Sequence, residues 1–162
     1  MFKINDYIVY NKDICKIERI LEKYYNDEDY YELKSVSDNS LSIKIPVSSK
    51  KIRTLITKEQ LKEIISSIPN IEVIEENDRM MENTYKTLMH SGTHEDLIKI
   101  IKTTYLRNEK RLNDNKKISE IDDSYFRTAE KFLYNEFSIV LNKTYDETKD
   151  YVINEVLKSK KK

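Results

Sequence analysis

The stretch LSIKIPVSSKKIRTLITKEQLKEIISSIPN, residues 41–70, contains the change of hydrophobic period that decides the fold. In residues 41–45 apolar and polar side chains alternate, which is typical of a β-strand, and Pro46 ends the run. Thr57 and Gln60 form a capping box. After it, apolar residues recur three and four positions apart, which predicts an amphipathic helix. The chain passes here from a β-rich part to a helical part, so we expect the α+β class.

The residues before this stretch carry further strand patterns. We expect strands at residues 7–10, 14–23 and 30–36, because these runs are rich in β-branched and aromatic residues. Polar turns at residues 26–29 and 38–40 separate them from one another and from the next strand. Short strands at this spacing predict a small twisted sheet or a partial barrel.

The residues after it are expected to form four more helices with recognisable N-caps. Asn77 or Asp78 caps the first helix, Thr93 the second and Ser119 the third, and a capping box at residues 144–147 opens the last. The apolar stripes predict that these side chains face inward: Leu61, Ile64, Ile65, Ile68, Met81, Tyr85, Leu88, Leu97, Ile98, Ile101, Tyr105, Ile121, Phe126, Ala129, Phe132, Leu133, Val140, Leu141, Tyr151, Val152 and Val156.

These patterns predict three segments. Residues 1–56 form a β-rich domain, residues 57–76 a bridging helix with an acidic linker, and residues 77–162 an all-α helical domain.

Composition limits the function classes. The 162 residues include 29 Lys+Arg and 29 Asp+Glu, whereas a free-standing nucleic-acid binder usually carries a basic excess. Any nucleic-acid contact must therefore be local, weak or helped by a partner. The single Gly cannot supply a phosphate-cradling loop. Neither an apolar signal segment nor a run of 18 apolar residues is visible, so we expect a cytoplasmic protein without membrane contact.

Catalytic motifs are not recognisable, and we expect neither an enzyme nor a bound cofactor or metal. Cys15 is the only cysteine, and it has no neighbouring His or basic cluster that would activate it. His90 and His94 have a metal-ligand spacing, but Gly92 lies between them and is expected to end a helix. We interpret them as two surface histidines, and a metal-dependent enzyme remains a distant alternative.

The tyrosines are a stronger signal. Tyr24, Tyr25, Tyr30 and Tyr31 flank one expected hairpin, and tyrosine is enriched at protein–protein hot spots. A core role for about half of the tyrosines and the stacking of single-stranded nucleic acid are the alternatives. The acidic residues of the same hairpin disfavour nucleic acid.

The order of these parts resembles the CarD/CdnL family of bacterial transcription regulators. Residues 1–10, MFKINDYIVY, are similar to the family's opening FKVGDxVVYP, and residues 41–46 with 52–56 are similar to its "vPv…lRxli" stretch. Residues 88–92, Ser119 and residues 125–129 fall where its helical domain has its "L-x-SG" and "S…ML-x-x-A" patterns.

The resemblance implies a non-enzymatic factor with two domains. The family's N-terminal domain is Tudor-like, also occurs in the transcription-repair coupling factor, and binds the β subunit of RNA polymerase. Its helical domain contacts promoter DNA at the upstream edge of the transcription bubble. There the factor modulates the stability of the open promoter complex.

The polymerase-binding positions of the family can be carried over one by one. Its basic residue after the first long strand falls on Lys23, its apolar partner on Tyr25 and its second basic residue on Lys44. Ile45 and Pro46 belong to the same edge. We therefore expect these five residues to bind the polymerase β subunit.

The DNA-binding positions match less well. The family's DNA-wedging Trp falls at Asn77 or Asp78, and this chain contains no Trp. Its neighbouring basic residue falls on Arg79, and we add Lys86 as a nearby cation. We thus expect DNA contacts from Asn77, Arg79 and Lys86. These contacts should be weaker or altered, because the chain has no aromatic side chain to wedge into the DNA. The main alternative is a polymerase-docked adaptor whose helical domain recruits another protein; the oligomeric state stays open.

Overall fold

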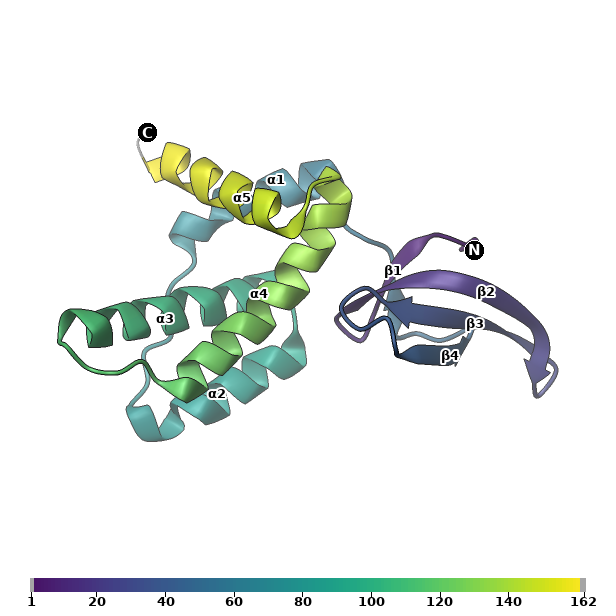
Figure 1. Cartoon of the computed structure of the whole chain (residues 1–162), viewed down its shortest axis with the longest axis horizontal. Helices are drawn as coiled ribbons and strands as arrows, with labels where there is room; N and C mark the ends of the chain where they lie inside the picture. The colour runs from purple at the N-terminus through teal and green to yellow at the C-terminus, as the bar shows by residue number, and fades with distance from the viewer. Residues whose placement is uncertain (1, 161–162) are drawn as a thin grey trace. The chain divides into compact units, whose positions relative to one another are not determined.

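The computed structural model describes residues 2–160, with side chains up to residue 158, and it confirms the α+β class. The chain divides into two compact units, Met1–Thr57 and Lys58–Lys162 (Figure 1). The first is a five-stranded sheet and the second contains five α-helices. No helix of the described residues combines the length and the apolar character that crossing a membrane requires.

The β unit is an antiparallel sheet with the strand order β4-β3-β2-β1-β5. Its strands are β1 (Tyr7–Tyr10), β2 (Asp13–Tyr25), β3 (Glu28–Ser35), β4 (Ser42–Pro46) and β5 (Ile52–Arg53). The predicted strands are therefore confirmed, and β2 is longer at both ends than expected. Because β4 lies last in the order, one of its sides has no strand partner among the described residues.

Two tight turns without glycine make the hairpins. Asn11 and Lys12, with φ of 52° and 78°, join β1 to β2, and Asn26 and Asp27, with φ of 51° and 60°, join β2 to β3. Positive φ at both central residues matches the right-handed twist of paired strands, and Asn and Asp tolerate it better than most residues. Asn and Asp therefore take three of these four positions in place of glycine, and Lys12 takes the fourth.

Two irregularities bend β2. Ile17 pairs with Leu33 and Arg19 with Glu32, so Glu18 is an extra residue; a second shift lies between Leu21 and Tyr25. Bulges strengthen the local twist of a strand. The second shift lies directly beside the hairpin tip.

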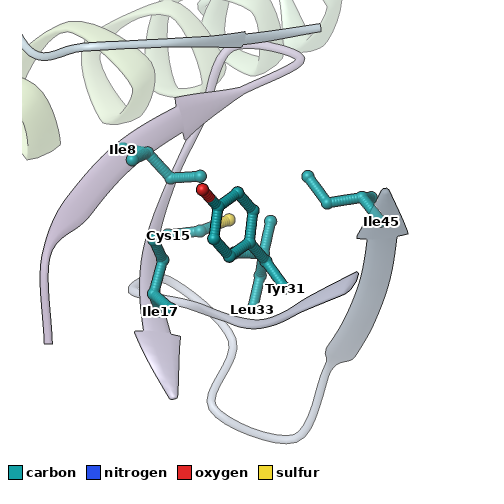
Figure 2. Packing of buried hydrophobic residues seen from close by; sticks show 6 residues of the cluster. All are labelled: Ile8, Cys15, Ile17, Tyr31, Leu33 and Ile45. Carbon is teal, nitrogen blue, oxygen red and sulfur yellow. The ribbon is translucent and has the colours of Figure 1, made fainter. Parts of the chain in front are cut away.

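One face of the sheet carries the core of this unit. Ile8, Cys15, Ile17, Tyr31, Leu33 and Ile45 are buried together there (Figure 2). These residues come from four neighbouring strands and alternate with residues of the other face, as the strand period requires. Burial also raises the pKa of the Cys15 thiol to about 12, so it stays protonated at neutral pH.

The helical unit contains α1 (Lys58–Ser67), the 3-10 turn η1 (Ile68–Asn70), α2 (Asp78–Ser91), α3 (His94–Asn113), α4 (Glu120–Leu141) and α5 (Tyr145–Lys160). Residues 57–76 were predicted to form a bridging helix with a linker. In the structure α1 contacts α5 and α4 and lies within the second unit, Lys58–Lys162.

Side-chain caps begin four of these helices. Asn77, Thr93 and Ser119 accept hydrogen bonds from the backbone amides three residues ahead. Thr144 and Glu147 exchange bonds in both directions as a capping box. Gly92 ends α2 in the left-handed conformation with φ of 66°. These predicted caps and the predicted stop are confirmed.

The inward faces differ from the prediction at two places. Tyr105 and Ile121 were expected inside, but 56% and 50% of their surfaces are exposed. Thr104 and Asp122 are buried instead. Arg107 and Arg111 of α3 bind the Asp122 carboxylate in the interior. The first turn of α4 therefore faces inward with Asp122 and not with Ile121.

Candidate functional site

The tip of the β2–β3 hairpin carries two of the predicted polymerase-binding residues. Tyr25 is 61% exposed, and Lys23 lies beside it in the irregular segment of β2. Lys23 has a φ of 46°, and its amide donates a hydrogen bond of 2.9 Å to Asp29 Oδ1. That bond holds the left-handed residue in place. Its ammonium lies 3.9 Å from Asp27 at the turn, an exposed pair that is worth little.

Lys44 projects from β4 beside a charged cluster centred on Glu32. The Lys44 ammonium lies 3.9 Å from Glu32, which also binds the Arg19 guanidinium and accepts a 3.1 Å hydrogen bond from Ser42. The bond from Arg19 is the main reason why the pKa of Glu32 is lowered. Lys44 is therefore a partly exposed cation next to a carboxylate that stays ionised.

The other two predicted residues of this set have structural positions. Ile45 is 5% exposed and belongs to the core of the sheet, so its side chain cannot be a surface contact. Its backbone lies on the edge strand. Pro46 is half-buried opposite Tyr30 at the end of β4, where a residue without an amide donor is tolerated.

These residues do not form one compact cluster. Tyr25 pairs with Glu28 and Lys44 with Glu32, so their positions differ by four residues along β3. At ~3.3 Å per residue this is a separation of roughly 13 Å along the strand. The predicted site is thus a band that runs from the hairpin tip along the free edge of β4.

The three predicted DNA contacts lie at or in α2. Asn77 is the N-cap, and its side chain accepts a 3.0 Å hydrogen bond from the amide of Met80. Lys86 lies 3.6 Å from Glu82 on the same helix. Arg79 is exposed, and among the described residues its side chain makes no hydrogen bond or ion pair. Arg79 is therefore the member of this set best placed to meet an anion.

The surroundings of Arg79 are acidic. Glu75, Glu76, Asp78 and Glu82 lie within four residues of it in the sequence. An isolated cation among carboxylates gives little electrostatic attraction for DNA. This start of α2 is thus a poor intrinsic DNA-binding surface.

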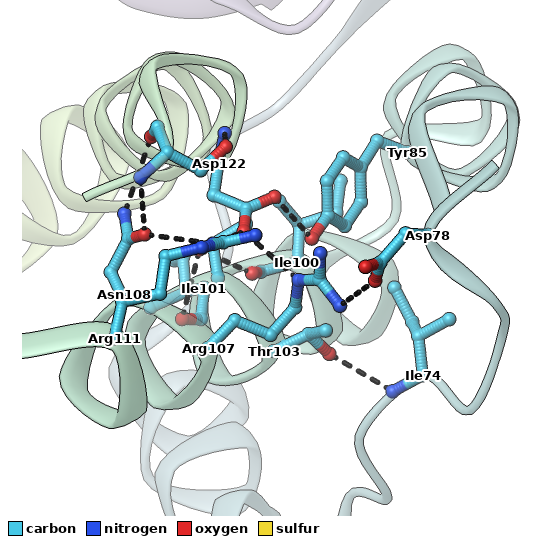
Figure 3. A network of polar contacts seen from close by, with 12 residues as sticks. Ile74, Asp78, Tyr85, Ile100, Ile101, Thr103, Arg107, Asn108, Arg111 and Asp122 are labelled. Carbon is cyan, nitrogen blue, oxygen red and sulfur yellow. Dashed lines mark hydrogen bonds and ion pairs between the residues drawn. The ribbon is translucent and has the colours of Figure 1, made fainter. Parts of the chain in front are cut away.

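A buried network around Asp122 was not predicted as such. Asp122 is 2% exposed, and its carboxylate accepts hydrogen bonds of 2.9 Å from Tyr85, 2.9 Å from Arg107 and 2.8 Å from Arg111 (Figure 3). Burial alone would raise the pKa of Asp122, but these donors outweigh it and hold the pKa below its ordinary value. Asp122 is therefore ionised and joins α2, α3 and α4.

Further bonds extend this network to the helix ends. Arg107 also reaches Asp78 at the start of α2, at 3.1 Å. Asn108 accepts a 2.8 Å bond from the amide of Ser119, the N-cap of α4. The sequence signal was the presence of two arginines four residues apart on α3, but nothing in it indicated which carboxylate they meet. We interpret the network as structural, since both carboxylate oxygens of the buried Asp122 accept hydrogen bonds from side chains of the neighbouring helices.

The two histidines are on different helices, as predicted. His90 lies in α2 and is exposed, whereas His94 opens α3. His94 was expected at the surface, but its Nε2 lies 2.9 Å from the buried carboxylate of Glu136 and its ring stacks on Phe137. Among the described residues, no group of His, Cys, Asp or Glu is arranged to hold a metal ion.

Comparison with known proteins adds no identification. No protein-family model matches the chain, and no curated protein matches it.

Proposed function

We propose that this chain is a bacterial transcription regulator that docks on the β subunit of RNA polymerase through its β unit. From there its helical unit modulates the stability of the open promoter complex at the upstream edge of the bubble. The proposal is supported by the ordered motifs that resemble the CarD/CdnL family, together with a small antiparallel sheet followed by a helical unit.

The single observation that carries it is the free edge of β4. An unpaired strand edge accepts an added strand from another protein, with backbone hydrogen bonds for affinity and flanking side chains for specificity. Lys44 on that edge and Lys23 at the hairpin tip suit acidic groups of a partner. Tyr25 supplies an exposed aromatic anchor.

Binding of the full chain to the isolated β-subunit lobe tests this proposal. Lys44→Glu places a second carboxylate beside Glu32 and should weaken binding about tenfold or more, since like charges disfavour the approach of an acidic partner. Lys51→Glu is the matched control, because it makes the same charge change beside Asn11, in the turn at the end of β1. Equal binding by Lys44→Glu and wild type would refute the docking assignment.

The charge balance is compatible with action at DNA only after docking. Tethering to the polymerase raises the local concentration of promoter DNA, so that a contact of low intrinsic affinity can be effective. The effect on open complexes should therefore disappear together with polymerase binding in Lys44→Glu.

A protein-only adaptor is the second candidate. It is favoured by the state of the α2 residues: Asn77 is used as a cap, Lys86 is paired with Glu82, and Arg79 lies among carboxylates. In this version the helical unit recruits another protein to the docked complex. The two candidates differ in salt dependence, because release of counterions from DNA accompanies only the first.

A further inference from the structure

The face of the sheet opposite its core carries two neighbouring rows of charged side chains. Side chains alternate along a strand, so the residues next to the core residues of β2, β3 and β4 point to this second face. The strand register defines the rows: the first contains Tyr7, Lys16, Lys34 and Ser42, and the second contains Arg19, Glu32 and Lys44. We call these seven residues the basic face.

The basic face has an excess of positive charge. Its two rows contain four cations and one carboxylate, that of Glu32. Both oxygens of this carboxylate have partners: one binds Arg19, and the other accepts a 3.1 Å hydrogen bond from Ser42 and lies 3.9 Å from Lys44. Glu32 therefore has no oxygen left for the two lysines of the first row.

Lys16 and Lys34 stand directly opposite each other on β2 and β3. Like charges at opposite positions of neighbouring strands destabilise a sheet. Among the described residues neither lysine forms an ion pair, and Lys16 only lies 6.0 Å from the centre of the Tyr7 ring. A repulsive pair that is not neutralised within the unit indicates an anion from outside.

The other carboxylates of this region do not cancel the excess. Glu18, the extra residue of the bulge, adjoins Arg19 in the chain; if it shared the face, four cations would still oppose two carboxylates. Glu28 lies four positions before Glu32 on β3, where it binds Ser48. The acidic residues that disfavour nucleic acid at the hairpin thus lie toward its tip, outside the two rows.

Tyrosine rings border the basic face. Tyr7, at the end of the first row, is 38% exposed. Tyr30 follows the second row on β3, and its ring lies 5.2 Å from that of Tyr24, which is 53% exposed. A sheet face that combines cations with exposed rings is typical of sites for single-stranded nucleic acid, because the backbone meets the cations and the bases stack on the rings. An acidic protein segment would need only the cations.

We propose that the basic face binds single-stranded nucleic acid. Phosphates of the strand contact Lys16, Lys34 and Arg19. Unpaired bases stack on Tyr7 and Tyr24. The inference does not depend on polymerase docking, because neither lysine of the first row nor either of these tyrosines belongs to the docking residues. DNA and RNA share the phosphates and the base faces, so the test includes both.

Fluorescence anisotropy of labelled oligothymidylate and oligouridylate, titrated with the full chain, tests the proposal. The chain has no net charge, so we expect low affinity and measure at low ionic strength. Binding of at least one oligonucleotide should saturate and weaken steeply with added salt. A DNA duplex and a polyglutamate peptide should bind roughly tenfold more weakly, since neither offers unpaired bases.

Lys34→Glu separates binding from folding. It replaces the repulsion of Lys16 by attraction, so thermal unfolding should show a gain in stability. The same change should weaken oligonucleotide binding roughly tenfold and reduce its salt slope by about 1 or more. Lys62→Glu is the control, because it makes the same charge change at an exposed position of α1.

Tyr7→Ala tests the stacking. It should weaken oligonucleotide binding about fivefold or more, whereas Tyr7→Phe keeps the ring and should bind like the wild type. The proposal is overturned if neither oligonucleotide binds saturably, if Lys34→Glu binds like the wild type, or if Tyr7→Ala and Tyr7→Phe bind equally. It is also overturned if the duplex or polyglutamate binds as tightly as the single strands, since the face would then serve duplex DNA or an acidic protein.

Discussion

The Tyr85 hydroxyl on α2 donates a hydrogen bond of 2.9 Å to the buried carboxylate of Asp122 in the first turn of α4. The same carboxylate binds Arg107 and Arg111 of α3. Three helices thus meet at one negative charge. A buried charge is tolerated only when it is paired and fully hydrogen-bonded, so this point determines how the helices are rotated against one another.

Asp122→Asn is expected to destabilise the helical unit by about 3 kcal/mol. The amide keeps the shape and can still accept from Tyr85, but it leaves Arg111 without a counter-charge and Arg107 with only the exposed carboxylate of Asp78. Guanidinium unfolding followed by far-ultraviolet circular dichroism measures the loss. Tyr85→Phe, which removes one neutral donor, should lower the free energy of unfolding by only about 1 kcal/mol. Equal losses for both variants would contradict the central role of the charge.

Acid should unfold the wild type in a way that depends on Asp122. Because its pKa is lowered in the folded state, its stabilising contribution is complete above the unfolded pKa of ~3.9 and is lost as the pH falls through the folded value. The difference in unfolding free energy between wild type and Asp122→Asn should therefore shrink as the pH is lowered below about 4. A difference that is constant between pH 7 and pH 3 would contradict this sign.

Gly92→Ala is expected to cost about 1 kcal/mol of stability. Gly92 ends α2 with φ of 66°, a conformation that a β-carbon disfavours. Gly92→Asn is the matched control, because Asn tolerates the left-handed region, and it should lose clearly less. Thermal unfolding of the three proteins provides the comparison. If Ala and Asn are equally harmful, the loss comes from contacts of the side chain rather than from φ.

Asp27→Gly is expected to stabilise the β unit by roughly 0.5–1 kcal/mol. Asn26 and Asp27 have φ of 51° and 60°, and Asn-Gly is the favoured pair for such a turn. Asp27→Asn removes the same carboxylate, and with it the exposed pair to Lys23, without freeing the backbone, so it should be close to neutral. Urea unfolding measures both; a gain by Asp27→Asn as large as that by Gly would assign the effect to charge.

The parts of the fold that depend on neighbours in the sequence were predictable. The caps at Asn77, Thr93 and Ser119 bond to amides three residues away, and strand alternation reports directly on the face that a residue occupies. The rotation of α4 was not predictable, since it depends on Asp122 meeting two arginines 11 and 15 residues earlier in the chain. The prediction considered only the spacing of apolar residues, and it therefore placed Ile121 inside.

In the candidate site, too, the features set by nearby residues were predictable and the features set by packing were not. The sequence indicated exposed residues at the hairpin tip, and Lys23 and Tyr25 lie there. It could not distinguish Ile45 as a core residue from Ile45 as a contact, because alternation along β4 does not say which face is covered.

Arg79→Ala tests the DNA contact separately from docking. If Arg79 meets a phosphate in the docked complex, its loss should reduce the salt slope of binding to a polymerase–promoter complex by about 1, while binding to polymerase alone is unchanged. Lys62→Ala, an exposed lysine of α1, is the control and should leave the slope as it is. Because Asn77 is occupied as a cap and Lys86 is paired with Glu82, Arg79 is the position at which a DNA contact should be most visible. If the binding of the wild-type chain shows the same salt slope with and without promoter DNA, that contact is excluded and the adaptor is favoured.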